Sequence, residues 1–225
     1  MAGSGDDEEE RGRPLSRGDL LKRAGVLGAA ATLPVAARTE HAGAAEEVAQ
    51  LKQLKALSPS QATTIGAFVE RLIPTDASGP GAREANVLRY IDRALARDLW
   101  MFRASYVAAT QALDAYSQSK YGTDFAVLST DKQDAVLTDM DLNRATGFNP
   151  NAKAVFEMIR THAVQGMFGD PAHGGNTGMA GWKLVRFPGP RLVISAHDQQ
   201  LNVVPKSNMK SAYSMSLFKS TWARW

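Results

Sequence analysis

Apolar residues recur at helical spacing along most of the chain, and the clearest run follows Asn86. Large apolar and aromatic side chains there are separated by three or four residues, which places them on one face of a helix. They are Leu88, Ile91, Leu95, Leu99, Phe102, Tyr106, Ala109, Leu113 and Tyr116. We therefore predict one long helix or a broken helical pair that ends before Tyr121-Gly122 and packs this stripe into the core.

Local start signals predict further helices on either side of this run. Ser58, followed by Pro59 and Gln61, forms a capping box with proline at the first helical position. The helix that begins there has one apolar face and ends at Pro74, because proline cannot continue a helix. A second capping box is predicted at residues 130–133, where a short helix begins.

A segment rich in glycine and proline follows a helix that we predict from Asn151 to Phe168. Between Gly166 and Pro190 there are seven glycines and three prolines, which are unsuited to a helix interior or a central strand. The segment also contains large apolar side chains of the kind that a disordered linker lacks. They are Phe168, Met179, Trp182, Leu184, Val185 and Phe187. We predict an ordered irregular loop, and ordered long loops are often functional.

Beyond this loop, residues 192–195 form the only convincing strand-like run, and the rest of the chain has no clear periodicity. The pattern as a whole predicts a mainly α protein, a helical domain with a long ordered Gly/Pro-rich loop and an extended C-terminal arm. We divide the chain into an N-terminal arm (residues 1–45), a helical domain (residues 46–190) and a C-terminal arm (residues 191–225).

Composition excludes several classes of function. The formal net charge is only +3, and the charges are mixed, so the basic stripe of a nucleic-acid-binding protein is missing. The chain has no cysteine, which excludes disulfides, thiolate metal sites, iron–sulfur clusters and covalent haem attachment through C-x-x-C-H. No apolar run approaches the roughly 20 residues that a transmembrane helix needs.

The first 45 residues have the pattern of an export signal. Basic residues precede a short, weakly apolar stretch from Ala24 to Ala37, and Ala42-Gly43-Ala44 fits an A-x-A cleavage pattern. Residues 16–22 resemble a twin-arginine signal in which Gly18 replaces the second arginine. We expect a periplasmic or otherwise exported protein. The alternative is an unprocessed N-terminal arm on a cytoplasmic protein.

Motifs for catalysis are not found in the sequence, which has no nucleophile elbow, P-loop, zinc-binding H-E-x-x-H or dinucleotide-binding fingerprint. His162, His173, His197 and Asp170 include residue types that ligate metals, but their spacing is not that of a helical ligand pair. A core position for His162 and a turn-forming role for Asp170 are the alternatives.

Contact with a partner protein is the functional hypothesis for the glycine-rich loop. The candidate interface residues are Asp170, His173, Gly174, Gly175, Asn176 and Trp182. For His173 and Asn176 the alternative is turn chemistry that pins the loop. Trp182 either anchors the loop on the helices or serves as an interface anchor, and the two roles are compatible.

Three features, taken together, give the chain a family resemblance. They are residues 70–76 (ERLIPTD), residues 168–176 (FGDPAHGGN), and residues 181–183 (GWK) with residues 187–189 (FPG). In this order they resemble the gluconate 2-dehydrogenase subunit 3 family, over roughly residues 57–190. Members of the family commonly carry an export signal, and the tail after Pro190 is not matched.

The resemblance implies a non-catalytic small subunit, without a cofactor of its own, in a sugar, polyol or glycoside dehydrogenase complex. Its expected partner is a large flavoprotein of the glucose–methanol–choline type that holds FAD, and a cytochrome c often accepts the electrons. The small subunit is expected to stabilise the flavoprotein and to assist its folding or export. Two alternatives stay open: a self-contained exported binding module without a flavoprotein, and a free-standing hydrolase or metal enzyme.

Overall fold

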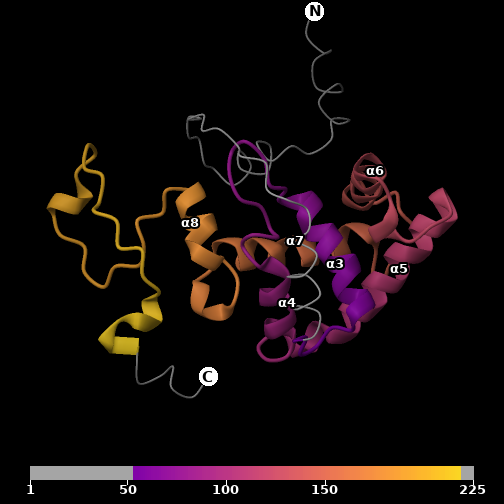
Figure 1. Cartoon of the computed structure of the whole chain (residues 1–225), viewed down its shortest axis with the longest axis horizontal. Coiled ribbons are helices and arrows are strands. Elements are labelled where there is room, and N and C mark those ends of the chain that lie inside the picture. The colour runs from indigo at the N-terminus through magenta and orange to yellow at the C-terminus, as the bar shows by residue number, and fades with distance from the viewer. Residues whose placement is uncertain (1–52, 219–225) are drawn as a thin grey trace, which may run out of the picture.

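The computed structural model describes residues 53–218, and this part of the chain is mainly helical, with no strand among the described residues (Figure 1). The predicted mainly α fold class is therefore confirmed. The predicted export signal lies outside the described residues, as do residues 46–52 of the helical domain and the last seven residues of the C-terminal arm.

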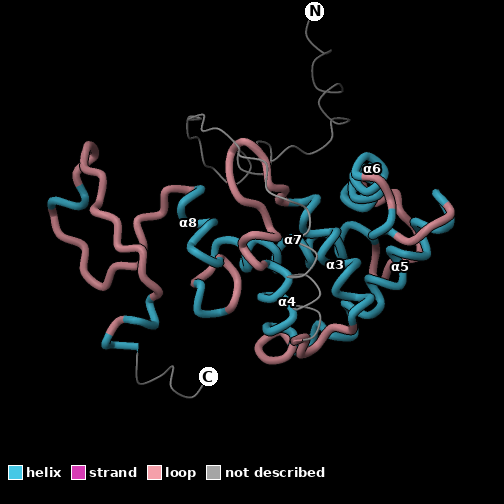
Figure 2. The backbone as a smooth tube through the Cα atoms, in the orientation of Figure 1, coloured by secondary structure: helices cyan, strands magenta, loops and turns pink. Residues whose placement is uncertain are grey.

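The helices are α3 (Pro59–Leu72), α4 (Val87–Leu95), α5 (Arg103–Tyr121), α6 (Thr130–Asp141), α7 (Ala152–Phe168) and α8 (Ala180–Leu184). Short 3-10 turns connect several of them. Helix α7 contacts α3, α4, α6 and α8, and in Figure 1 it crosses the middle of the molecule. Helix α8 lies between these helices and the C-terminal arm, which Figure 2 shows to be mostly loop.

The capping box predicted before α3 is present. The backbone N–H of Gln61 donates to Ser58 Oγ at 3.3 Å, and the backbone N–H of Ser58 donates to Gln61 Oε1 at 2.9 Å. Both side chains thus satisfy donors that the first helical turn leaves without a backbone partner. From this start the helix buries Ala62, Ile65 and Phe68 against the rest of the core.

The long apolar stripe after Asn86 is a broken helical pair, one of the two predicted forms. Helix α4 ends at Leu95, a 3-10 turn covers residues 100–102, and α5 begins at Arg103. Its members Ile91, Leu95, Tyr106, Ala109 and Leu113 are buried, and the others are half-buried against the core. The break also frees the backbone carbonyl of Leu95, which accepts a hydrogen bond from Arg103 Nε at 2.7 Å.

Asp92 on α4 is a buried carboxylate that fixes the segment preceding α3. Its oxygens accept hydrogen bonds from the backbone N–H groups of Lys55, Ala56 and Leu57, at 2.8, 2.9 and 2.9 Å. A buried charge is tolerated when it is fully hydrogen-bonded, and three N–H donors provide that here. These hydrogen bonds connect the segment before the N-terminus of α3 to the side of α4.

The second predicted capping box was wrong. The N-cap of α6 is Ser129 rather than Thr130, and Ser129 makes no side-chain capping bond. Gln133, which we expected to reach back to the cap, is buried and donates instead to the carbonyl of Phe125 at 3.1 Å. Tertiary contact with the turn before α6 thus overrides the local capping pattern.

The strand predicted at residues 192–195 is also absent from the described chain. These residues lie in an exposed loop of the C-terminal arm, and the side chains of Leu192, Val193 and Ile194 are largely exposed. A strand needs a neighbour to satisfy its backbone groups, and no segment in the described part of the chain pairs with this one.

Candidate functional site

The glycine-rich loop is ordered around one fully buried side chain, Asn176. Its Nδ2 donates to the carbonyl of Gly169 at 2.8 Å, and its Oδ1 accepts from the backbone N–H of Gly181 at 2.9 Å. These two bonds connect the end of α7 to the start of α8 across the loop. The backbone of Asn176 is left-handed, with φ of 47°, a conformation that asparagine tolerates better than most residues.

Two glycines allow this loop to lie directly on the backbone of α7. A Cβ at Gly175 would lie 2.2 Å from the carbonyl oxygen of Gly166, and one at Gly181 would lie 1.9 Å from that of Met167. No real side chain is compatible with such distances, so only glycine fits either position. Close packing within this chain therefore explains two of the seven glycines between Gly166 and Pro190.

Trp182 anchors the loop on α7, which was one of its two predicted roles. Its ring is buried, its Nε1 donates to the carbonyl of Phe168 at 2.8 Å, and it meets the ring of Phe187 edge to face at 5.0 Å. A buried indole needs a partner for its N–H, and the end of α7 supplies it. Contact between Trp182 and a partner protein stays a prediction.

Asp170 forms the predicted turn and also holds the C-terminal arm. Its Oδ1 accepts from the backbone N–H of Ala172 at 2.9 Å and from Ser211 Oγ at 2.6 Å, while its Oδ2 accepts from the backbone N–H of Ala212 at 2.7 Å. The second and third partners lie about 40 residues further along the chain, so no local pattern in the sequence indicated them. One carboxylate thus joins the loop to the arm.

A cavity of about 440 Å³ lies where α4, the loop and the arm meet. Its lining includes Tyr90, Arg93, Arg97, His173, Tyr213 and Phe218. The rings of His173 and Tyr213 meet edge to face with centres 5.3 Å apart. Gly174, with φ of 100°, lies so close to Arg93 that a Cβ would be 2.9 Å from its Nη1. Of the six predicted interface residues, His173 and Gly174 are therefore beside this cavity, whereas Gly175, Asn176 and Trp182 are packed inside the chain.

The segment at residues 70–76 has a structural role. Arg71 on α3 makes two hydrogen bonds of 2.7 Å to the carboxylate of Asp134 on α6, an ion pair with bidentate geometry. Glu70 accepts from the backbone N–H of Arg83 at 3.2 Å, and its burial raises its pKa. The segment thus joins α3 to α6 and to the loop that precedes α4.

The four residues of metal-ligating type, Asp170, His162, His173 and His197, do not form a cluster. Among residues 53–218 no group of three or more histidines and carboxylates is placed to hold a metal ion. His162 is a core residue, as the alternative interpretation had it: its Nδ1 is 3.0 Å from the hydroxyl of Tyr106, and burial lowers its pKa. His197 lies in the exposed part of the C-terminal arm.

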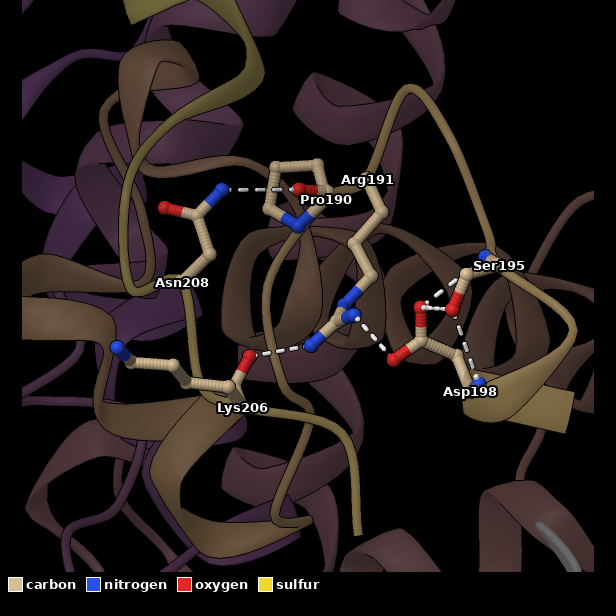
Figure 3. Close-up of polar contacts among 6 residues, drawn as sticks. All are labelled: Pro190, Arg191, Ser195, Asp198, Lys206 and Asn208. Atoms are coloured by element: carbon tan, nitrogen blue, oxygen red, sulfur yellow. Dashed lines mark hydrogen bonds and ion pairs between the residues drawn. The ribbon is translucent and has the colours of Figure 1, made fainter. Parts of the chain in front are cut away.

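Residues 191–208, which we call the arm loop, follow α8 and project away from the other helices (Figure 1), and polar contacts within the loop are drawn in Figure 3. At its base the backbone N–H of Asn208 donates to the carbonyl of Pro188 at 2.6 Å, and Asn208 Nδ2 donates to that of Pro190 at 3.2 Å. Across the loop, Arg191 donates to the carbonyl of Lys206 and forms an ion pair with Asp198 at 3.1 Å. The loop is therefore closed by its own polar groups.

Comparison with known proteins gives the chain a family. The family model described as gluconate 2-dehydrogenase subunit 3 matches residues 59–189, more than half of the chain, and ends where the arm loop begins. No curated protein and no solved structure matches significantly. Within residues 53–218, none of the helices combines the length and the apolar character needed to cross a membrane. The chain belongs to the gluconate 2-dehydrogenase subunit 3 family, the small accessory subunits of dehydrogenase complexes.

Proposed function

We propose that this chain is the non-catalytic small subunit of an FAD-dependent dehydrogenase complex that oxidises a sugar, polyol or glycoside. The observation that carries the proposal is the family match over residues 59–189. The internal use of the loop residues is compatible with it, since Asn176, Gly181 and Trp182 hold the backbone of the loop against α7. A subunit of this kind contributes shape and stability while its partner performs the chemistry.

In this proposal the large partner is a flavoprotein of the glucose–methanol–choline type, which binds FAD, and a cytochrome c receives the electrons. The small subunit stabilises the flavoprotein and assists its folding or its export. The sequence pattern of residues 1–45 supports an exported or periplasmic location for the complex.

Purification of the tagged full chain from its source organism at low salt tests the proposal. We expect a much larger chain to co-purify, with the visible absorption of a flavin and with dye-reducing dehydrogenase activity toward gluconate, glucose or a related sugar. Mass spectrometry identifies that chain. A colourless, monodisperse single chain would contradict the proposal and favour a self-contained binding module.

The assisting role has its own test. The flavoprotein is produced with and without this chain in the same host, and soluble, flavin-loaded flavoprotein is measured in the cytoplasmic and periplasmic fractions. We expect the yield of loaded flavoprotein to fall when this chain is missing, and its periplasmic fraction to fall when residues 1–45 are deleted. Equal yields in both fractions with and without the chain would exclude the assisting role.

A further inference from the structure

The arm loop has the reverse of the usual arrangement of polar and apolar side chains. The side chains of Arg191 and Asp198, which form its internal ion pair, are only 20% and 21% exposed. In contrast, Val193 and Val204 are 80% and 91% exposed, and Leu201 is fully exposed. Leu192 and Ile194 are more than half exposed as well. Single exposed aliphatic residues are common, but five within thirteen positions of one loop mark a surface for contact.

The loop keeps this arrangement because its base is closed tightly. Gly189 lies against the backbone of Asn208, where a Cβ would be 1.8 Å from the carbonyl oxygen, so only glycine permits the two segments to approach. Asp198 adds a second closure through its ion pair with Arg191 at 3.1 Å, and its Oδ2 fixes a local turn by accepting from the hydroxyl and the backbone N–H of Ser195 at 2.8 and 3.1 Å (Figure 3). A loop held in one shape before binding loses little conformational entropy when a partner covers it.

The position of the loop leaves its apolar side chains available. In Figure 1 it projects beyond α8, on the side of the molecule away from α5 and α6, and the helices do not cover it. It is nevertheless fixed to them, because Asp170 binds Ser211 and Ala212 just after the loop. The exposed aliphatic side chains therefore lie on a loop whose end is hydrogen-bonded to the segment after α7.

We propose that the arm loop docks on the catalytic subunit of the dehydrogenase complex, which buries Leu192, Val193, Ile194, Leu201 and Val204. The proposal rests on the proposed function, since it adds the surface through which the accessory subunit holds its partner. Family membership implies association with a catalytic subunit, and this loop is the described segment with the densest exposed aliphatic surface.

A protein surface fits the composition of the loop better than a lipid surface does. Segments that bind at membrane interfaces combine Trp or Phe with several Lys or Arg on a polar face. Residues 191–208 contain no Phe, Tyr or Trp and only two Lys or Arg residues, Arg191 and Lys206, and Arg191 is paired with Asp198 within the loop. Aliphatic side chains on a rigid loop suit an apolar groove of a folded protein.

The test compares two variants of the tagged full chain, each replacing exposed valine or leucine with aspartate. The docking variant is Val193→Asp, Leu201→Asp and Val204→Asp together. The control is Val127→Asp, which changes a side chain that is 73% exposed on the turn before α6, away from the arm. Each is purified from the source organism without its native copy, and the co-purifying dehydrogenase chain is quantified by mass spectrometry and by dye reduction with gluconate and glucose.

We expect the docking variant to retain roughly tenfold less dehydrogenase chain than the wild type, and the control to retain the wild-type amount. Helical circular dichroism and thermal unfolding of both variants should match the wild type, because all four side chains are exposed. The single variant Leu201→Asp gives a partial loss if the triple variant is poorly produced.

The outcomes separate this inference from the proposed function. A wild-type chain that retains no dehydrogenase chain contradicts the proposed function and the docking inference with it. Equal retention by wild type and docking variant overturns the docking inference alone. It is overturned as well if the purified wild type is a dimer that the substitutions convert to a monomer, or if it binds anionic lipid vesicles through the same residues.

Discussion

The helical body and the arm loop treat apolar residues in opposite ways. In the body, the buried ring of Phe68 packs against those of Phe125 and Phe156, and the buried carboxylate of Asp92 accepts three backbone N–H groups. In the arm loop, the ion pair is sheltered and the aliphatic side chains are exposed. Contacts within the chain account for the packing of the body, whereas we attribute the exposed aliphatic surface of the arm loop to the proposed contact with a catalytic subunit.

The largest expected difference in unfolding free energy is between one substitution in the helical body and one in the arm loop. Phe68→Ala removes a fully buried ring and should lower the free energy of unfolding by about 3–5 kcal/mol. Leu201→Ala in the arm loop should change it by less than about 0.5 kcal/mol, because that side chain makes little contact within the chain. Chemical unfolding followed by circular dichroism measures both, and similar losses would remove the distinction between the regions.

Asn176→Ala should have the second largest effect, because it leaves buried backbone groups without partners. The carbonyl of Gly169 and the N–H of Gly181 both lose their hydrogen bonds, at a cost of about 1–3 kcal/mol for each buried group left unsatisfied. We expect a lower unfolding free energy and increased amide exchange at residues 174–182. A matched control is Asn143→Ala on an exposed turn, and an equal loss there would show that Asn176 has no special role.

Measuring the free energy of unfolding as a function of pH tests whether the burial of His162 in the helical body opposes its protonation. Burial lowers the pKa of His162 below its ordinary value of 6.5, so the unfolded chain binds a proton more readily than the folded one. The contribution of neutral His162 to the free energy of unfolding is fully present above about pH 6.5. It is lost as the pH falls toward the pKa of His162 in the folded chain, by at most about 1.4 kcal/mol per pH unit. His162→Gln should flatten this dependence. An unchanged slope in that variant would assign the pH sensitivity to other groups.

The smallest expected effect on global stability concerns the link between the two regions. Asp170→Asn replaces one of the two carboxylate oxygens that accept from Ser211 and Ala212 by an NH2 group, which cannot accept a hydrogen bond. The contacts between the helices are unchanged. We expect proteolysis within residues 191–208 to become several-fold faster, with a change in global unfolding of less than about 1 kcal/mol. The exposed Asp131→Asn on α6 is the control. Equal cleavage rates in wild type and Asp170→Asn would show that Asp170 does not hold the arm.

Some features of the fold followed directly from sequence patterns. The box formed by Ser58 and Gln61 depends on residues three apart, and the stripe after Asn86 depends on steps of three and four; both were confirmed. The box at residues 130–133 failed because Gln133 bonds to the turn before it, and the strand at residues 192–195 failed because no other segment in the described chain pairs with it. A local sequence pattern indicates which secondary structure a segment can form, but it does not indicate which other segment it will contact.

The sequence by itself determined the mainly helical fold, which follows from spacings within single segments, and the family resemblance, which follows from the order of three short motifs. The irregular loop predicted at residues 166–190 is in part wrong, because it includes the short helix α8. Only the tertiary structure decided that Asn176 and Trp182 are buried, that Asp170 binds the arm, and that Leu201 and Val204 are exposed. These are properties of contacts between residues far apart in the chain. An apolar residue has the same identity in a core and on an exposed loop, so its role depends on what the fold places beside it.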